Sequence, residues 1–145
     1  MILPITLTAA GVAALLNLWL AIRIGRVRTA EKISVGDAGN ERLIRRMRAQ
    51  ANFVEFTPFV LILIFLIELS TGTSMLLWGV MALYMLARIA HAFGMDGNAM
   101  ARGAGIAVTM LVLLGLAGYA VYVAHASTGR ITVLQPEAIE AVPAG

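Results

Sequence analysis

Four long apolar stretches, separated by short polar segments, dominate the chain. Residues 1–22, 56–67, 69–87 and 103–129 contain no Asp, Glu, Lys or Arg. A membrane-spanning helix needs about 20 apolar residues, so three of these stretches can span a membrane unaided. The stretch at 56–67 can do so only if Glu55 or Glu68 is tolerated at its edge. The pattern predicts four transmembrane helices at about 2–24, 41–70, 74–95 and 101–126.

The segments between and after these stretches carry turn and loop signals. Residues 36–40 read GDAGN, a turn cluster whose last residue, Asn40, is a good N-cap for the second helix. Residues 127–145 contain two prolines and little apolar periodicity, so we expect a loose C-terminal tail there. A signal peptide is the alternative interpretation of residues 1–22, but no basic residue precedes that apolar run. The chain is therefore predicted to be one four-helix domain, residues 1–126, followed by a tail.

The composition supports an integral membrane protein. Hydrophobic residues make up 60% of the 145 residues, charged residues only 13%, and the mean hydropathy is +0.87. A soluble domain has about 45–50% apolar and roughly 25% charged residues. The chain has no cysteine, which excludes disulfides, thiolate metal sites and a cysteine nucleophile. We therefore predict an all-α integral membrane fold, a bundle of four transmembrane helices.

The positions of the basic residues predict the orientation in the membrane. Eight of the eleven Lys and Arg residues lie between Arg23 and Arg48, and two more, Arg88 and Arg102, flank the third connection. The positive-inside rule then puts the first and third connections in the cytoplasm and both termini outside, in a multi-pass membrane protein. We expect this basic cluster to contact anionic lipid headgroups. Nucleic-acid binding is not expected, because no soluble module or interleaved aromatic pattern accompanies the net charge of +3.

The second predicted helix carries the most suggestive polar pattern. It is about 45 Å long, against a hydrocarbon core of about 30 Å, so one end must project from the membrane while Glu55 lies inside it. Arg45, Arg48, Asn52 and Glu55 are spaced to share one helical face. One interpretation is a structural ion pair of Glu55 with Arg48 or Arg88. The other is a polar pocket, open to the cytoplasm, for a zwitterionic ligand with carboxylates and an amine.

Other charged positions are less informative by themselves. Glu68, near the outer end of the second helix, is expected to reach the lipid headgroups. Arg88 and His91 share one face of the third helix. Arg102 begins the fourth helix, where a local anion would relieve its unfavourable position at the positive end of the helix dipole. There is no HExxH motif and no histidine cluster, so no metal is expected.

A family resemblance appears in the second helix. Residues 48–58 read RAQANFVEFTP, which resembles the RAxxNxxExxP signature of the MAPEG family, the membrane-associated proteins of eicosanoid and glutathione metabolism. The GDAGN segment at 36–40 and the ARIAH segment at 87–91 are also similar to bacterial members. The resemblance extends from the first helix to the fourth, and its likeness to bacterial members implies a place in the bacterial inner membrane.

The resemblance implies a homotrimer that binds glutathione, as co-substrate, between neighbouring subunits at the cytoplasmic side. Arg102 corresponds to the arginine that sits at the glutathione thiol in catalytic members. A further set of residues is expected to contact glutathione, with Arg26 or Arg28 reaching it from the adjacent subunit: Arg48, Gln50, Asn52, Glu55, Arg88, His91, Arg26 and Arg28.

Two functions remain open from the sequence. The first is a glutathione-dependent transferase or peroxidase acting on small hydrophobic electrophiles that arrive from the membrane lipid. The alternative is a non-catalytic lipid-binding or scaffold protein of the same family. Phe56 and Met95 occupy positions where related enzymes often have tyrosines. The missing hydroxyl groups would weaken glutathione binding or change the chemistry.

Overall fold

The chain forms four helices, as the apolar pattern predicts. The structure is a computed structural model that describes residues 2–139, with side chains described for residues 2–127. Its helices are α1 (Pro4–Glu31), α2 (Glu41–Thr71), α3 (Met75–Gly94) and α4 (Ala99–Ile139). All four contain a segment long and apolar enough to cross a membrane. The predicted all-α, four-helix membrane fold is therefore confirmed.

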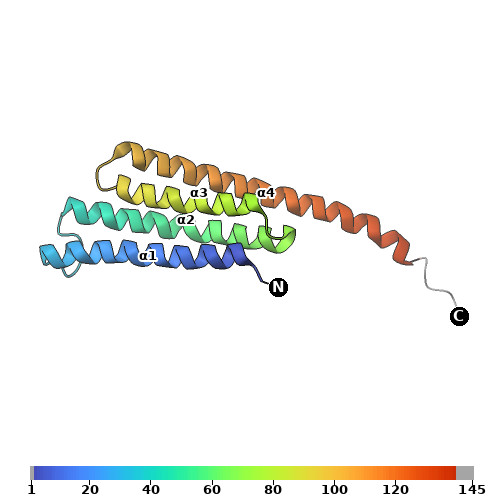
Figure 1. The fold of residues 1–145 in the computed structure, drawn as a ribbon, viewed down its shortest axis with the longest axis horizontal. Coiled ribbons are helices and arrows are strands. Elements are labelled where there is room, and N and C mark those ends of the chain that lie inside the picture. Colours follow the sequence, from blue (N-terminus) through green and yellow to red (C-terminus); the bar gives the residue numbers. More distant parts are fainter. Residues whose placement is uncertain (1, 140–145) are drawn as a thin grey trace.

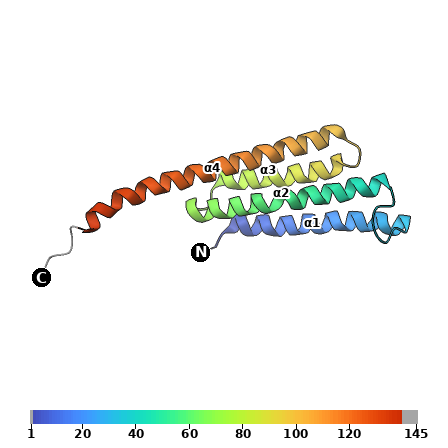
Figure 2. The same cartoon turned by 180° about the vertical axis from the view of Figure 1, so that it is seen from behind.

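The helices lie side by side in an up-and-down bundle, with α1 and α4 on opposite sides (Figure 1). The contacts between α3 and α4 and between α1 and α2 are the most extensive, and α2 also packs on α3 and α4. The connections 32–40 and 95–98 lie together at one end, which we call the basic end. The start of α1 and the connection 72–74 lie at the opposite end, where α4 extends beyond the other helices (Figure 2).

The bundle interior is apolar and closely packed. Ile5, Val60, Ile64 and Tyr84 are fully buried, and the Tyr84 hydroxyl shares a 2.8 Å hydrogen bond with the Thr57 hydroxyl. Many large apolar side chains instead face outward: Leu15, Phe59, Leu83, Leu111 and Leu114 are among them. An outward apolar surface of this kind fits a lipid environment, where side chains need no contact with water.

Local signals in the sequence explain how α2 begins. The Asn40 side chain accepts a hydrogen bond from the Leu43 backbone N–H at 3.0 Å, so the predicted N-cap is confirmed. The preceding turn needs a left-handed backbone at Gly36 and Gly39, with φ of 70° and 71°. Pro58 lies inside α2 without ending it.

Two helices extend beyond their predicted ends. The expectation for α1 was an end near residue 24, but α1 continues to Glu31. Arg26 and Arg28 are good helix formers, and basic residues are favourable near a helix C-terminus. The fourth helix was expected to end near 126 and to be followed by a loose tail at 127–145. α4 continues to Ile139, and residues 140–145 lie outside the described part of the chain. An apolar run marks what lies in the membrane, whereas the helix itself can continue past it.

Glu68 has a different role from the one predicted. It is only 1% exposed, and its carboxylate accepts hydrogen bonds from the backbone N–H groups of Ile5 (3.0 Å) and Thr6 (2.8 Å). It also accepts from the hydroxyls of Thr6 (2.7 Å) and Thr73 (3.0 Å). The expectation that Glu68 reaches the headgroups was wrong. Leu3, at the N-cap of α1, has no side chain that can accept a hydrogen bond. Glu68 of α2 instead accepts hydrogen bonds from the free backbone N–H groups at the start of α1.

Candidate functional site

The polar face of α2 opens onto a cavity near the basic end. Arg48, Asn52 and Glu55 line this cavity from α2, and His91 and Met95 line it from the end of α3. Its volume is about 170 Å³. Asn52 is half-buried, whereas Arg48 and Glu55 are exposed in the single chain. The structure thus brings together three residues of the α2 motif and the histidine of α3, in a cavity that opens to the outside of the bundle.

A second cavity adjoins the first at Met95, which lines both. It has a volume of about 190 Å³, and its wall includes Arg45 of α2, Gly94 and Gly97 beside the connection 95–98, and Arg102 of α4. Arg102 is therefore near the α2 motif, although it does not line the same cavity. The two cavities together carry three arginines and one glutamate, an arrangement that favours a ligand with more negative than positive charge.

Arg88 lies behind the first cavity rather than in its wall. It is 3% exposed, and its Nη2 donates to the Asn52 Oδ1 at 2.8 Å while its Nη1 donates to the Thr109 hydroxyl at 3.3 Å. A guanidinium only donates, so the Asn52 side chain must present its oxygen to Arg88. The amide N–H groups of Asn52 are then left to donate elsewhere, which suits a carbonyl or carboxylate in the cavity.

His91 is buried against the same cavity with an unmet polar atom. It is 3% exposed, and among the described residues its Nδ1 has no hydrogen-bond partner. The Nε of Arg88 is likewise buried without a partner. Buried polar groups are normally hydrogen-bonded, and leaving one unmet costs about 1–3 kcal/mol. His91 therefore lies against the cavity with one buried nitrogen that no described residue satisfies.

The ion-pair interpretation of Glu55 was wrong. Ion pairs within the described residues join Arg23 to Asp96, Arg45 to Glu41 and Arg46 to Asp96, and none includes Glu55. The sequence spacing allowed a pair with Arg88, but Arg88 points to Asn52 and Thr109 instead. Glu55 is left exposed in a membrane-length helix, where a charge needs a partner from a ligand or another chain.

Three predicted residues do not reach the cavity within one chain. The Gln50 Nε2 donates to Asn17 Oδ1 on α1 at 3.1 Å. Arg26 is exposed, and Arg28 lies against Met47, with 3.6 Å between its Nη2 and the sulfur. The roles predicted for Gln50, Arg26 and Arg28 require a neighbouring subunit, so they stay predictions.

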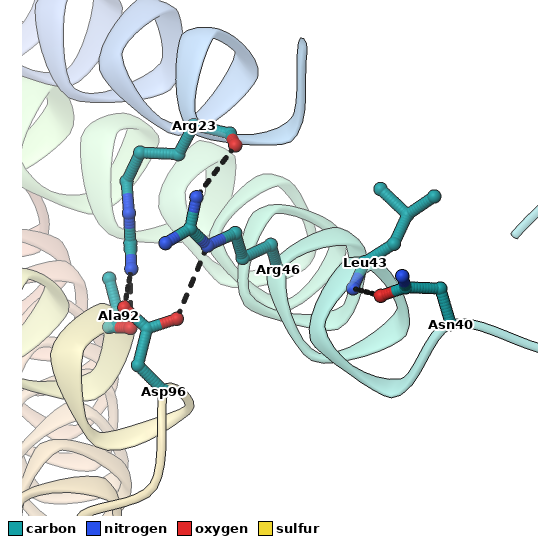
Figure 3. Close-up of polar contacts among 6 residues, drawn as sticks. All are labelled: Arg23, Asn40, Leu43, Arg46, Ala92 and Asp96. Atoms are coloured by element: carbon teal, nitrogen blue, oxygen red, sulfur yellow. Dashed lines mark hydrogen bonds and ion pairs between the residues drawn. The ribbon is translucent and has the colours of Figure 1, made fainter. Parts of the chain in front are cut away.

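Sequence reasoning missed a cluster that joins three elements at the basic end (Figure 3). The Asp96 carboxylate accepts from Arg23 of α1 and from the Nε of Arg46 of α2, the latter at 3.3 Å. Arg46 Nη1 also donates to the Arg23 carbonyl at 2.9 Å, and Arg23 Nη1 donates to the Ala92 carbonyl at 3.2 Å. One signal was available: Asp96 is the only acidic residue between Glu68 and Glu137. No group of three His, Cys, Asp or Glu side chains that could hold a metal occurs among the described residues.

A comparison with protein-family models finds one family that matches most of the chain. The model of the MAPEG family matches residues 6–122, which include parts of all four helices and every residue of the two cavities. A search of curated proteins finds no match. The family match and the four helices of membrane-spanning length together show that the protein is an integral, multi-pass membrane protein. The chain belongs to the MAPEG family, the membrane-associated proteins of eicosanoid and glutathione metabolism.

Proposed function

We propose that the protein is a glutathione-dependent transferase or peroxidase that acts on hydrophobic electrophiles at the membrane. The observation that carries the proposal is the cavity shared by Arg48, Asn52, Glu55 and His91. Family membership supports a function related to glutathione or eicosanoids in general. The cavity also contains groups that can bind the two carboxylates and the one amine of this small peptide.

Each polar group of the cavity complements one part of glutathione. Arg48 suits a carboxylate, because a guanidinium can form two charge-assisted hydrogen bonds to it. The Asn52 amide N–H groups, left free by Arg88, suit a carbonyl or a second carboxylate oxygen. Glu55, which has no partner among the described residues, suits the ammonium group. His91 lines the same cavity, and no described residue satisfies its buried Nδ1.

Arg102 is the residue we assign to activation of the thiol. Only the thiolate is a good nucleophile, and a nearby guanidinium favours the charged form. In conjugation, the sulfur forms a bond to an electrophilic carbon while the leaving group departs with its electron pair. In peroxide reduction, two glutathione molecules become the disulfide while the peroxide becomes an alcohol and water. The hydrophobic substrate would reach the site from the surrounding lipid.

We further propose that the site is completed in a homotrimer with its basic end in the cytoplasm. The exposed Glu55 and the open cavities support a neighbouring subunit as their cover. A neighbour could also supply Gln50 and either Arg26 or Arg28, which do not reach the cavity within one chain. The basic residues gathered on the ends of α1 and α2 that flank the connection 32–40 support the cytoplasmic placement.

The test is a titration of the detergent-purified protein with glutathione, followed by calorimetry and by the ultraviolet absorbance of the thiolate. We expect the wild type to bind glutathione and to show thiolate, and Arg102→Ala to lose the thiolate signal. Arg42→Ala is the matched control, because Arg42 lies at the same end of the bundle but lines neither cavity. Absence of glutathione binding by the wild type would overturn the proposal.

One observation favours the non-catalytic alternative. An apolar cavity of about 430 Å³ lies between α3 and α4, lined by Val80, Leu83, Val108, Val112 and Leu116 among others. Its lining would suit a fatty acyl chain. A protein that bound a fluorescent fatty acid, bound no glutathione and showed no thiolate signal would be a lipid-binding member of the family.

A further inference from the structure

The connection between α3 and α4 determines the positions of two residues of the site, Met95 and Arg102. It spans residues 95–98, and Met95, at its start, lines both cavities. The Asn98 side chain caps α4 by accepting from the Ala101 N–H at 3.0 Å, and the Arg102 N–H donates to the Asn98 carbonyl, also at 3.0 Å. The position of this turn therefore fixes where Met95 and Arg102 lie.

The turn and the two helices it joins form one rigid unit. A Cβ added at Gly94 would lie 2.2 Å from the Arg102 backbone nitrogen, and one added at Gly105 would lie 2.7 Å from the Ala87 carbonyl oxygen. At both places the backbones of α3 and α4 touch, so neither helix can shift without the other. Displacement of the turn would consequently move Arg102 together with Met95.

Asp96 ties this unit to the other two helices. Its carboxylate bonds with Arg23 of α1 and Arg46 of α2, which are 8% and 14% exposed at their side chains (Figure 3). The Arg23 guanidinium also lies 4.7 Å from the Trp19 ring centroid and 5.5 Å from that of Phe93. These aromatic contacts restrict Arg23 and keep it directed at the turn.

Two polar contacts, one from α2 to α3 and one from α2 to the connection 95–98, lie on either side of the first cavity. Deeper in the bundle, Arg88 of α3 bonds with Asn52 of α2. At the basic end, Asp96 bonds with Arg46. The cavity lies between these two contacts, so their lengths set the separation of its two walls.

We infer that Asp96 is a positioning residue that holds the turn, and with it Met95 and Arg102, at the glutathione site. One carboxylate is the shared ion-pair partner of two partly buried guanidinium groups here. Removing its charge would leave Arg23 and Arg46 facing each other unpaired, and an uncompensated buried charge is strongly unfavourable. The expected response is for the turn to move away from α2, which opens the site. The part of this inference that concerns glutathione rests on the proposed function.

A spin label can test, without any ligand, whether Asp96 holds the turn in place. The chain has no cysteine, so Met100→Cys, in the first turn of α4 and 84% exposed, gives a single labelling site. Electron paramagnetic resonance of the labelled full-length protein reports the mobility of the turn. We expect Asp96→Asn to raise this mobility and Asp96→Glu, which keeps the charge, to restore most of the order. Asp37→Asn is the control, since Asp37 lies in the other connection at this end and its carboxylate bonds only with the Gly39 N–H among the described residues.

Glutathione affinity, measured on the same variants, tests the effect on the site. Misplacing binding groups by about 1 Å can cost a hundredfold in rate, so we expect at least about tenfold weaker binding in Asp96→Asn. Each variant must remain folded at the assay temperature, as its midpoint of denaturation shows, which separates positioning from loss of fold. Unchanged label mobility would overturn the inference, and so would mobile label with unchanged affinity. If the wild type binds no glutathione, the proposed function fails, while the label still decides whether Asp96 holds the turn.

Discussion

Two glutamates of the same helix have opposite surroundings. Glu68, near the end of α2, accepts four hydrogen bonds from α1 and from the connection 72–74, and it is 1% exposed. Glu55, 13 residues earlier, is exposed and has no ion pair among the described residues. The first carboxylate is fully satisfied by its own chain, whereas the second needs a group from outside it. The comparison separates a carboxylate that builds the fold from one available for binding.

Reversing the charge at Glu55 is expected to have the largest effect. Glu55→Arg would place a cation where the ligand ammonium should lie, and truncation or reversal of a buried charge pair costs about 2–5 kcal/mol. We therefore predict loss of measurable glutathione binding, by a factor of about 100 or more. Calorimetry in detergent measures it. Glu31→Arg is the control, because Glu31 ends α1, is exposed and lines neither cavity of the site.

The outcome also sharpens the contrast with Glu68. If Glu55→Arg abolished folding instead of binding, Glu55 would be a structural residue like Glu68, and the assignment of the cavity would fail. A folded, assembled protein that has lost glutathione binding is the expected result.

Replacing Glu68 should have the opposite effect. Glu68→Leu would leave the Ile5 and Thr6 N–H groups at the start of α1 without acceptors, inside a bundle that excludes water. Because charge-assisted hydrogen bonds contribute about 1.5–3 kcal/mol each, we expect a loss of about 3 kcal/mol in the free energy of unfolding. Denaturation of the detergent-solubilised protein by sodium dodecyl sulfate measures this loss.

Two controls accompany this variant. Glu68→Gln keeps one acceptor oxygen and should lose less stability than Glu68→Leu. The folded fraction of Glu68→Leu should bind glutathione as the wild type does. Weakened binding in a folded Glu68→Leu protein would show that the two ends of the bundle are coupled, against the separation argued above.

The same two glutamates show how far sequence reasoning reaches. Helix number follows from the lengths of the apolar runs, and the i, i+4, i+7 spacing of Arg48, Asn52 and Glu55 places them on one face, as the cavity requires. The spacing of residues along one helix does not show which distant residues their side chains will contact. Glu68 bonds with residues 62 and 63 positions away, and Asp96 bonds with an arginine 73 positions away. Such contacts depend on how the helices pack, which periodicity along one helix does not encode.

The smallest predicted effect concerns a hydroxyl that the cavity lacks. Met95 lines both cavities, and its side chain has no hydroxyl group. Met95→Tyr would add one donor beside His91 and Arg102, and a single hydrogen bond to a ligand contributes about 0.5–1.5 kcal/mol. We expect glutathione to bind about threefold to tenfold more tightly. The matched variant Met95→Phe adds the ring without the hydroxyl, so the difference between the two isolates the hydrogen bond. Equal affinities of Met95→Tyr and Met95→Phe would mean that glutathione does not approach Met95, and the cavity wall contributed by the α3–α4 connection would then lie outside the site.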